Sequence, residues 1–273
     1  VPWYRCFYVY SMGITTELVD LWAREPRLVP YLDMPIQHAS DRMLKLMRRP
    51  ERQQTIRTKV AWLRDAIPDL TIRTTALVGF PTESDAEFRE LLEFVDEIQF
   101  DRLGAFAYSP QEGTRAALLA DDVPDAVKRD RLEQVMELQR AVSADRLGRM
   151  VGRETDVLVD EPAALGDPGD LVGRSPFQAD DVDGCTYLRS PSDTAPGSFV
   201  RARVVETLDY DVIAEPASLG ARRSSPAPPR RWPAVRAGPP PPPPASPRCR
   251  RSASASWWTG TAARSARPAS SAS

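Results

Sequence analysis

Three segments of this chain share one layout, a run of apolar residues that passes directly into a polar turn. They are residues 31–40 (YLDMPIQHAS), 76–85 (ALVGFPTESD) and 100–110 (FDRLGAFAYSP). Parallel strands bring such turns together, because their carboxyl ends meet at one edge of the sheet, where α/β proteins bind ligands. The chain is therefore expected to form a parallel α/β fold with a binding site at these three strand ends.

Helix-like stretches alternate with the predicted strands. The strands are expected over residues 5–10, 29–36, 70–78 and 100–108, and apolar residues recur at steps of three and four over residues 16–24, 51–67 and 84–98. The last of these helices starts with a capping-box pattern, Ser-Asp-Ala-Glu. Pro124 is expected to start a long helix that continues to about Arg149. Residues 1–150 are thus predicted to hold repeated strand–helix units and a linking helix.

Residues 151–216 have a different sequence pattern. Short β-rich runs over 155–159, 184–188 and 199–213 are separated by Asp-Pro-Gly, Asp-Gly and Ala-Pro-Gly turns. This spacing is typical of a small antiparallel barrel. The segment carries fourteen acidic residues and five arginines, so its formal charge is about nine units negative. A surface this acidic repels nucleic acid and attracts a basic protein, although acidic residues are also ordinary solubilising surface.

The last segment, residues 217–273, contains a run of six prolines and ten arginines but no acidic residue. It offers almost no aliphatic residue for a core, so it is expected to be a disordered, low-complexity tail. Two interpretations remain: a basic tail that binds an anionic partner, or an out-of-frame translation beyond the true domain end. The abrupt break in composition favours the second.

Cysteine content and hydropathy exclude several classes of protein. Three scattered cysteines, Cys6, Cys185 and Cys249, are too few for a disulfide framework or a zinc site and are expected to be reduced thiols. Apolar runs stay well below the roughly 18 residues that a membrane-spanning helix needs. A cytoplasmic chain without membrane contact is the expectation.

The three strand–turn segments resemble, in order and wording, the radical-SAM methylthiotransferases. The segment Gln37-His38 with the following DRMLKLMRR is most similar to the branch that modifies an aspartate of a small-subunit ribosomal protein. The resemblance implies an α/β partial TIM-like barrel of radical-SAM type, made of the later βα units, followed by a small all-β TRAM barrel over residues 151–216.

The resemblance also implies cofactors. Members of this family use S-adenosyl-L-methionine and 4Fe-4S clusters, one of them held by a CxxxCxxC run that this sequence does not contain. We therefore expect a C-terminal fragment that begins downstream of the cluster loop and is inactive alone. No catalytic residue and no metal ligand is assigned. The sulfur donor is unknown.

Seven residues at or near the strand ends are candidates for binding the cofactor: Gln37, His38, Arg73, Thr75, Gly79, Phe80 and Tyr108. His38 is either a hydrogen-bonded turn residue or, as the resemblance implies, a cofactor contact. Gly79 lets the backbone approach a ligand closely, and the free amides of the helix that follows its turn are expected to point toward the crevice. Arg73 either contacts the methionine carboxylate or points to solvent, because a buried arginine is costly without an anion. Tyr108 closes the pocket rim or simply forms a turn.

The implied function is methylthio transfer to a basic small-subunit ribosomal protein, which the acidic barrel would attract. Two rivals remain at this point. One is a methylthiotransferase that acts on transfer RNA, for which an acidic barrel makes nucleic-acid binding less favourable. The other is a non-catalytic module in which the acidic barrel recruits a basic protein.

Overall fold

A parallel sheet of four strands forms the first part of the molecule. The structure, a computed structural model, describes residues 2–189 and 194–217. The sheet has the order β1-β2-β3-β4, so strands that follow one another in the chain are neighbours in space. Its strands are β1 (Tyr4–Cys6), β2 (Leu28–Asp33), β3 (Thr71–Val78) and β4 (Arg102–Ala107). This sheet is the predicted partial barrel.

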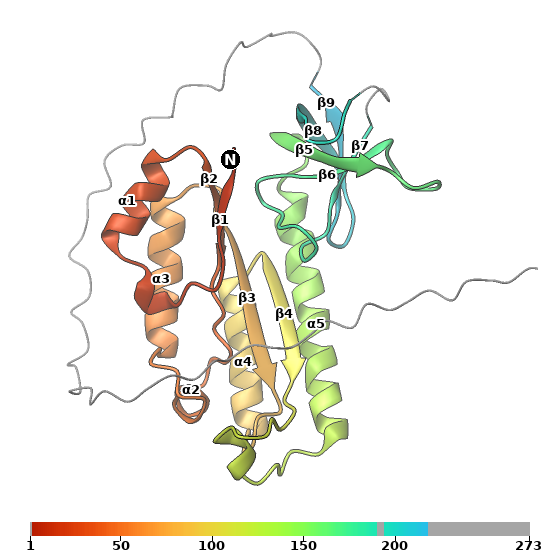
Figure 1. The fold of residues 1–273 in the computed structure, drawn as a ribbon. Coiled ribbons are helices and arrows are strands. Elements are labelled where there is room, and N and C mark those ends of the chain that lie inside the picture. The colour runs from red at the N-terminus through yellow and green to blue at the C-terminus, as the bar shows by residue number, and fades with distance from the viewer. Residues whose placement is uncertain (1, 190–193, 218–273) are drawn as a thin grey trace, which may run out of the picture. The chain divides into compact units, whose positions relative to one another are not determined.

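Helices connect these strands, as Figure 1 shows. They are η1 (Ser11–Gly13), α1 (Thr16–Arg24), α2 (Asp41–Leu46), α3 (Gln53–Ala66), α4 (Asp85–Ile98), η2 (Ala116–Leu118) and α5 (Asp125–Gly148). The helix predicted over residues 16–24 has these bounds, and Ser40 caps α2 by accepting a hydrogen bond from the Met43 amide. Periodic apolar residues therefore locate the helices well.

Two predicted strands are shorter in the structure than in the sequence analysis. The first ends at Cys6 rather than residue 10, and Tyr8 beyond it has a left-handed backbone. The second ends at Asp33, because Pro35 has no N–H to continue the ladder. The chain returns to the sheet at Gln37, which forms an isolated bridge with Ala76.

The helices cover only one face of the sheet. Along β3, Ile72, Thr74, Ala76 and Val78 are fully buried, whereas the alternate residues are partly exposed. Strand register places the same alternation on β2 and β4. We call the face of Arg73, Thr75 and Leu77 the open face. The strand residues in phase with them are Tyr31, Asp33, Arg102, Gly104 and Phe106, of which Tyr31, Asp33 and Arg102 are buried. The open face is the surface that a complete barrel would turn inward.

The amino end of α4 is held by the predicted capping box. The Ser84 hydroxyl accepts a hydrogen bond from the Glu87 amide, and the Glu87 carboxylate accepts one from the Ser84 amide at 3.0 Å. Arg42 adds two hydrogen bonds of 2.6 Å to the same carboxylate. Burial favours the neutral acid, but these donors outweigh it and lower the pKa of Glu87 to about 2.

Glu87 is therefore expected to make the stability of the protein pH-dependent. Its folded pKa lies below the ordinary value of 4.5, so its contribution is present above pH 4.5 and is lost as the pH falls toward 2. Through Glu87, the parent chain should lose at most about 3 kcal/mol of its free energy of unfolding in this window, and Glu87→Gln should abolish that part of the loss. Urea titrations at several pH values measure the free energy of unfolding. In the parent chain the half-exposed carboxylate of Glu97 pairs with Arg57. Glu97→Gln should therefore change the pH dependence of stability less than Glu87→Gln does.

The long helix α5 buries a polar face that the apolar periodicity did not reveal. Apolar spacing predicts that five residues of this helix point inward: Val127, Leu132, Val135, Leu138 and Val142. Of these, only Val135 and Val142 are fully buried. Buried with them are Lys128, Arg131, Gln139 and Ser143. These side chains hydrogen-bond to the protein; Gln139, for example, donates to the Phe100 carbonyl at 2.8 Å. The helix thus satisfies backbone groups at the ends of the sheet.

Residues beyond α5 form a closed five-stranded barrel in the order β5-β6-β7-β9-β8. Its strands are β5 (Glu154–Pro162), β6 (Leu171–Arg174), β7 (Thr186–Leu188), β8 (Phe199–Thr207) and β9 (Val212–Pro216). The barrel confirms the expected fold class. The predicted run over 199–213 is two strands separated by a turn, and β6 was not predicted.

Other expectations concern the chain as a whole. Within residues 2–189 and 194–217, no helix combines the length and apolar character needed to cross a membrane. Cys6 and Cys185 are free thiols. Cys249 and the tail predicted from residue 217 lie outside the described residues, apart from Ala217 itself.

Candidate functional site

The predicted strand ends meet at one edge of the sheet. The Gln37 amide donates to the Thr75 carbonyl at 2.8 Å, and the Leu77 amide donates to the Gln37 carbonyl at 2.7 Å. On the other side of β3, the Tyr108 amide donates to the Val78 carbonyl at 2.8 Å. Gln37 and Tyr108 thus flank the end of the strand that leads into Gly79.

His38 lies inside this edge and is completely buried. The Ser40 amide donates to its Nδ1 atom at 2.9 Å, so the ring proton is on Nε2, which lies 2.9 Å from Glu83 Oε1. Both nitrogens are therefore engaged within the chain. In this structure His38 orients Glu83 and fixes the turn after β2, and it does not face open space.

Glu83 connects His38 with the next strand end and with α5. Its second oxygen accepts hydrogen bonds from the Gly79 amide and, at 2.7 Å, from Arg131 Nη1. The side chains of His38 and Glu83 are fully buried, and that of Arg131 is nearly so. The three residues form a buried charged network that positions the Gly79 turn.

The backbone amides of this turn are used within the protein. Glu83 takes the Gly79 amide, and the Asp122 carboxylate accepts from the Thr82 amide at 2.7 Å. The amino end of α4 is capped by Ser84 and Glu87. The expectation that free amides of the following helix point toward a ligand is wrong for Glu87, whose amide is bound by the Ser84 cap. The Gly79 and Thr82 amides of the turn are likewise satisfied by neighbouring carboxylates.

Phe80 and Tyr108 form an apolar corner beside the turn. Their ring centroids lie 5.2 Å apart in an edge-to-face arrangement, and both rings pack with Met43. The Tyr108 hydroxyl is buried and has no hydrogen-bond partner among the described residues. Lys128 Nζ lies 5.5 Å from the centre of the Tyr108 ring. Burial raises the pKa of Tyr108, so this hydroxyl stays a neutral group that is buried without a partner in the described part of the chain.

Gly79 is required at this corner for two reasons. Its φ of 67° lies in the left-handed region, and a Cβ atom there would lie less than 3.0 Å from Lys128 Cγ. We expect Gly79→Ala to lower the free energy of unfolding by about 2 to 3 kcal/mol, the sum of backbone strain and overpacking. Chemical denaturation measures the change.

Gly113 provides the matched control. Its φ of 78° is similar, but an added Cβ atom would meet no atom within 4 Å. Gly113→Ala should therefore cost only the strain, about 1 kcal/mol. Equal losses in the two variants would show that contact with Lys128 contributes nothing.

Arg73 lies near the beginning of β3, away from the strand ends. Its guanidinium pairs with Asp33 at 3.1 Å and with Asp183, a residue of the barrel segment, at 3.4 Å. Burial alone would lower the pKa of Arg73, but the two carboxylates outweigh it and raise that pKa. Arg73 points neither to solvent nor to an empty anion site, because two protein carboxylates already neutralise it.

The structure brings five of the seven candidate residues together and places the other two elsewhere on the sheet. Gln37, His38, Gly79, Phe80 and Tyr108 gather at the strand ends. Thr75 lies on the open face between this edge and Arg73. Phe106 was not predicted as a binding residue, but its ring is 59% exposed on the open face beside Gly104. The alternation in FDRLGAFAY contained that signal, since Phe106 falls in phase with Arg102 and Gly104.

The residues fit the two implied cofactors to different degrees. Among the residues described, no group of three histidine, cysteine or acidic side chains could hold a metal ion, so an iron–sulfur cluster does not fit here. S-adenosylmethionine needs an apolar surface for its base and polar partners for its other groups. On the open face, the exposed Phe106 ring and the partly exposed Thr75 supply both kinds.

Comparisons with known proteins agree with this architecture. Residues 2–95 match the family model of the radical SAM superfamily, and residues 151–216 match that of the TRAM domain. The ribosomal protein uS12 methylthiotransferase RimO of Desulforudis audaxviator is 49% identical over 215 residues, 78% of this chain and 47% of the relative. The enzyme of the same name from Geobacter sulfurreducens is 44% identical over 79% of this chain and 48% of the relative.

Solved structures give a weaker match. Coproporphyrinogen III oxidase of Escherichia coli, a radical SAM enzyme, superposes with a TM-score of 0.43 at 20% identity, over 51% of this chain and 32% of the oxidase. The chain spans about half the length of the curated relatives it matches.

Proposed function

We infer that this chain, which belongs to the radical SAM methylthiotransferases, is part of an enzyme that adds a methylthio group to an aspartate of ribosomal protein uS12. The observation that carries the proposal is identity of 42 to 49% to proteins named for that activity, over 78 to 87% of this chain. S-adenosyl-L-methionine supplies the radical chemistry of this superfamily. The rest of the enzyme would supply the cluster ligands, and the sulfur donor is undefined.

The strand-end edge and the open face would hold S-adenosylmethionine. Phe106 offers an exposed ring, Tyr108 an unpartnered hydroxyl, and Gln37 and Thr75 further polar groups. His38 and Gly79 would act indirectly, because Glu83 joins them into the network that fixes the edge. The proposed roles are binding for the first group and positioning for the second.

The barrel would recruit the substrate. Four of its arginines, Arg174, Arg189, Arg201 and Arg203, pair with carboxylates of the same segment. Glu161, Asp170 and Asp181 are exposed and lie outside these ion pairs, so the surface stays negative. A negative surface attracts a basic ribosomal protein and repels RNA, which favours uS12 over transfer RNA as substrate. Such a partner also places the enzyme in the cytoplasm.

The test uses the complete gene product, including any coding sequence upstream of Val1. After its clusters are reconstituted anaerobically, it is incubated with uS12, S-adenosylmethionine, a reductant and a sulfide source. The expected result is a uS12 peptide in which one methylthio group replaces one hydrogen, detected by mass spectrometry. A modified transfer RNA nucleoside with unmodified uS12 would assign the enzyme to the other branch.

Binding measurements separate the enzyme from a recruiting module. The 273-residue chain should bind uS12 with an affinity that falls as salt rises, since the contact is electrostatic. It should also bind S-adenosylmethionine weakly, and Phe106→Ala should reduce that binding. Binding of uS12 without any affinity for S-adenosylmethionine, in the complete protein as well, would favour the module.

A further inference from the structure

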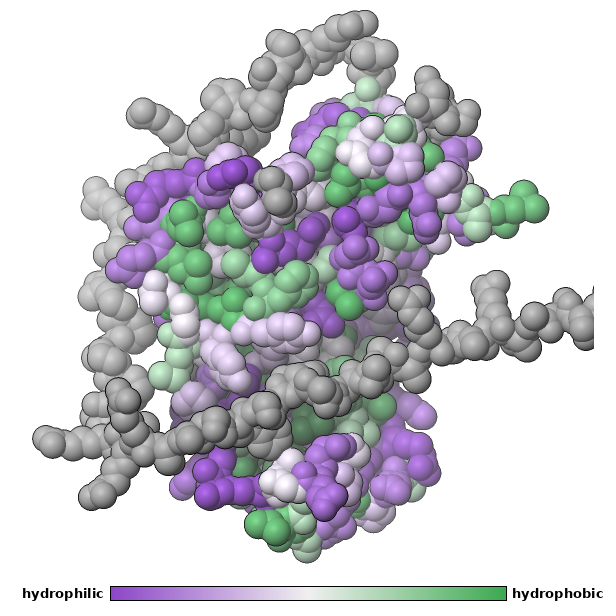
Figure 2. All heavy atoms as spheres, in the orientation of Figure 1, coloured by the Kyte–Doolittle hydropathy of each residue, from purple (hydrophilic) through white to green (hydrophobic). Residues whose placement is uncertain are grey.

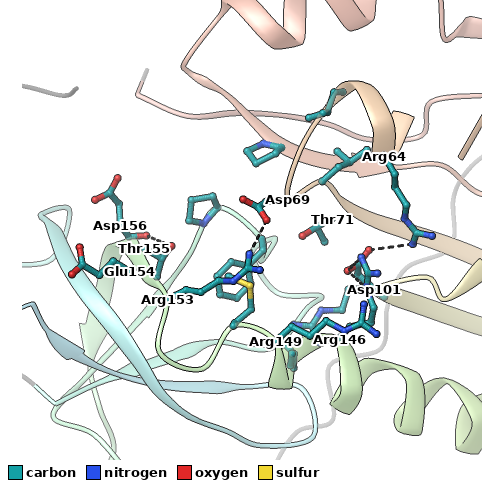
Figure 3. Close-up of a pocket in the computed structure, with 18 of the residues that line it drawn as sticks. Arg64, Asp69, Thr71, Asp101, Arg146, Arg149, Arg153, Glu154, Thr155 and Asp156 are labelled. Atoms are coloured by element: carbon teal, nitrogen blue, oxygen red, sulfur yellow. Dashed lines mark hydrogen bonds and ion pairs between the residues drawn. The ribbon is translucent and has the colours of Figure 1, made fainter. Parts of the chain in front are cut away.

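A second cavity lies at the opposite end of the strands from Gln37 and Tyr108. Its volume is about 470 Å³, and it is bounded by the beginnings of β3 and β4, the carboxyl end of α5 and the first strand of the barrel. Thr71, Asp101 and Arg102 line it from the sheet. Figure 3 shows lining side chains from the sheet segment, α5 and β5. The cavity is large enough for a small organic ligand.

Positive charge is concentrated on one side of this cavity. Figure 3 shows Arg64, Arg146 and Arg149 gathered around Asp101. Asp101 is shared, since it lies 2.7 Å from Arg146 and 3.8 Å from Arg64. One lining carboxylate thus serves two guanidinium groups. Burial and the neighbouring charge of Arg146 both lower the pKa of Arg64, as expected where cations crowd together.

Arg102 adds a buried cation that forms no close ion pair among the described residues, although the charges of Asp183, Asp101 and Asp211 act on it. Its residue is 5% exposed, and no carboxylate of the described residues lies within 4.0 Å of its guanidinium. Nη2 donates to the Tyr210 carbonyl at 3.1 Å, but Nη1 is buried without any hydrogen-bond partner. A buried, unpaired guanidinium is costly. An anion in the cavity that Arg102 lines would satisfy it.

We propose that this cavity binds a small phosphate-bearing ligand, with Arg102 as the buried contact and Arg64, Arg146 and Arg149 as the surrounding cations. The planar guanidinium matches the oxygen pattern of a phosphate group and contacts it through two parallel hydrogen bonds. The opposite side of the cavity carries Glu154 and Asp156 (Figure 3), which pair with Arg201, so positive charge for a long polyanion does not continue across it. A small ligand therefore fits better than a nucleic-acid strand.

Ligand binding would also strengthen contact between the sheet and the barrel. Arg102 belongs to β4, yet its second amino group holds the Tyr210 carbonyl of the turn between β8 and β9. Arg153, beside the barrel, pairs with Asp69 of the sheet segment at 2.7 Å across the same cavity. A ligand that binds only when these two contacts are formed stabilises them by mass action.

The test measures thermal unfolding and calorimetric binding of the 273-residue chain with inorganic phosphate, against chloride at equal ionic strength. Phosphate should raise Tm, and chloride should not. Arg102→Met, which keeps the length of the side chain without its charge, should remain folded and weaken phosphate binding at least about tenfold. Arg149→Gln, on the half-exposed rim, should weaken it about threefold.

Arg140→Gln is the matched control, because Arg140 is an exposed arginine of the same helix that does not line the cavity. It should bind phosphate like the parent chain. Equal effects of phosphate and chloride, or unchanged binding by both Arg102→Met and Arg149→Gln, would overturn the proposal. Tighter binding of a short oligouridylate that phosphate displaces would overturn the small-ligand assignment and identify a nucleic-acid phosphate as the source.

Discussion

Replacing Glu83 by glutamine is expected to lower the free energy of unfolding by about 3 to 5 kcal/mol. The variant keeps the shape of the side chain but removes the charge that Arg131 neutralises at 2.7 Å. It also presents an amide N–H to a set of partners that are all donors, since His38 Nε2, Gly79 N and Arg131 each donate to this carboxylate. Equilibrium denaturation in urea measures the loss.

Asp85→Asn is the control for this prediction. Asp85 contacts the same guanidinium at 2.6 Å, but its side chain is 87% exposed. An exposed pair contributes less than about 1 kcal/mol, so this variant should be nearly as stable as the parent chain. Comparable losses in the two variants would mean that the surface contact, and not the buried network, holds Arg131. The effect of Glu83→Gln should extend to S-adenosylmethionine binding, because the network positions the Gly79 turn.

The fold could be predicted where one physical signal dominates. Apolar periodicity and the capping box located α1 and α4 closely, because both signals are local in the chain. The buried face of α5 could not be predicted in the same way. Lys128 and Gln139 are buried there because they meet partners brought near by the tertiary structure, such as Asp121 and the Phe100 carbonyl. Periodicity of apolar residues contains no information about such partners.

The candidate site shows the same limit. The convergence of the strand ends follows from parallel pairing, so the positions of Gln37, Gly79 and Tyr108 could be predicted. The partner of each side chain could not. His38 hydrogen-bonds to Glu83, which lies 45 residues away in the chain. The argument that a buried Arg73 needs an anion was sound, but its anions are protein carboxylates, one of them 110 residues away at Asp183.

Replacing Asp183 by alanine should be the most damaging change at the contact between the sheet and the barrel. The Asp183 side chain is almost completely buried, accepts hydrogen bonds from the Tyr31 hydroxyl and the Ala179 amide, and pairs with Arg73. Burial, followed by the charge of Asp183, raises the pKa of Tyr31, which keeps that hydroxyl a donor. Removing the carboxylate leaves both Tyr31 and the Ala179 amide unpaired. We expect a loss of about 3 to 5 kcal/mol in the free energy of unfolding.

A double-mutant cycle shows whether this loss comes from the contact itself. Tyr31→Phe removes one hydroxyl and should cost about 1 to 2 kcal/mol. Because the two side chains touch, the double variant should be less destabilised than the sum of the single variants, by about 1 kcal/mol or more. Additive losses would mean that Asp183 acts only within its own loop, through the Ala179 amide. Coupled losses would instead establish that the barrel is anchored on the open face through Tyr31, so that the same face carries its anchor at one end and Phe106 at the other.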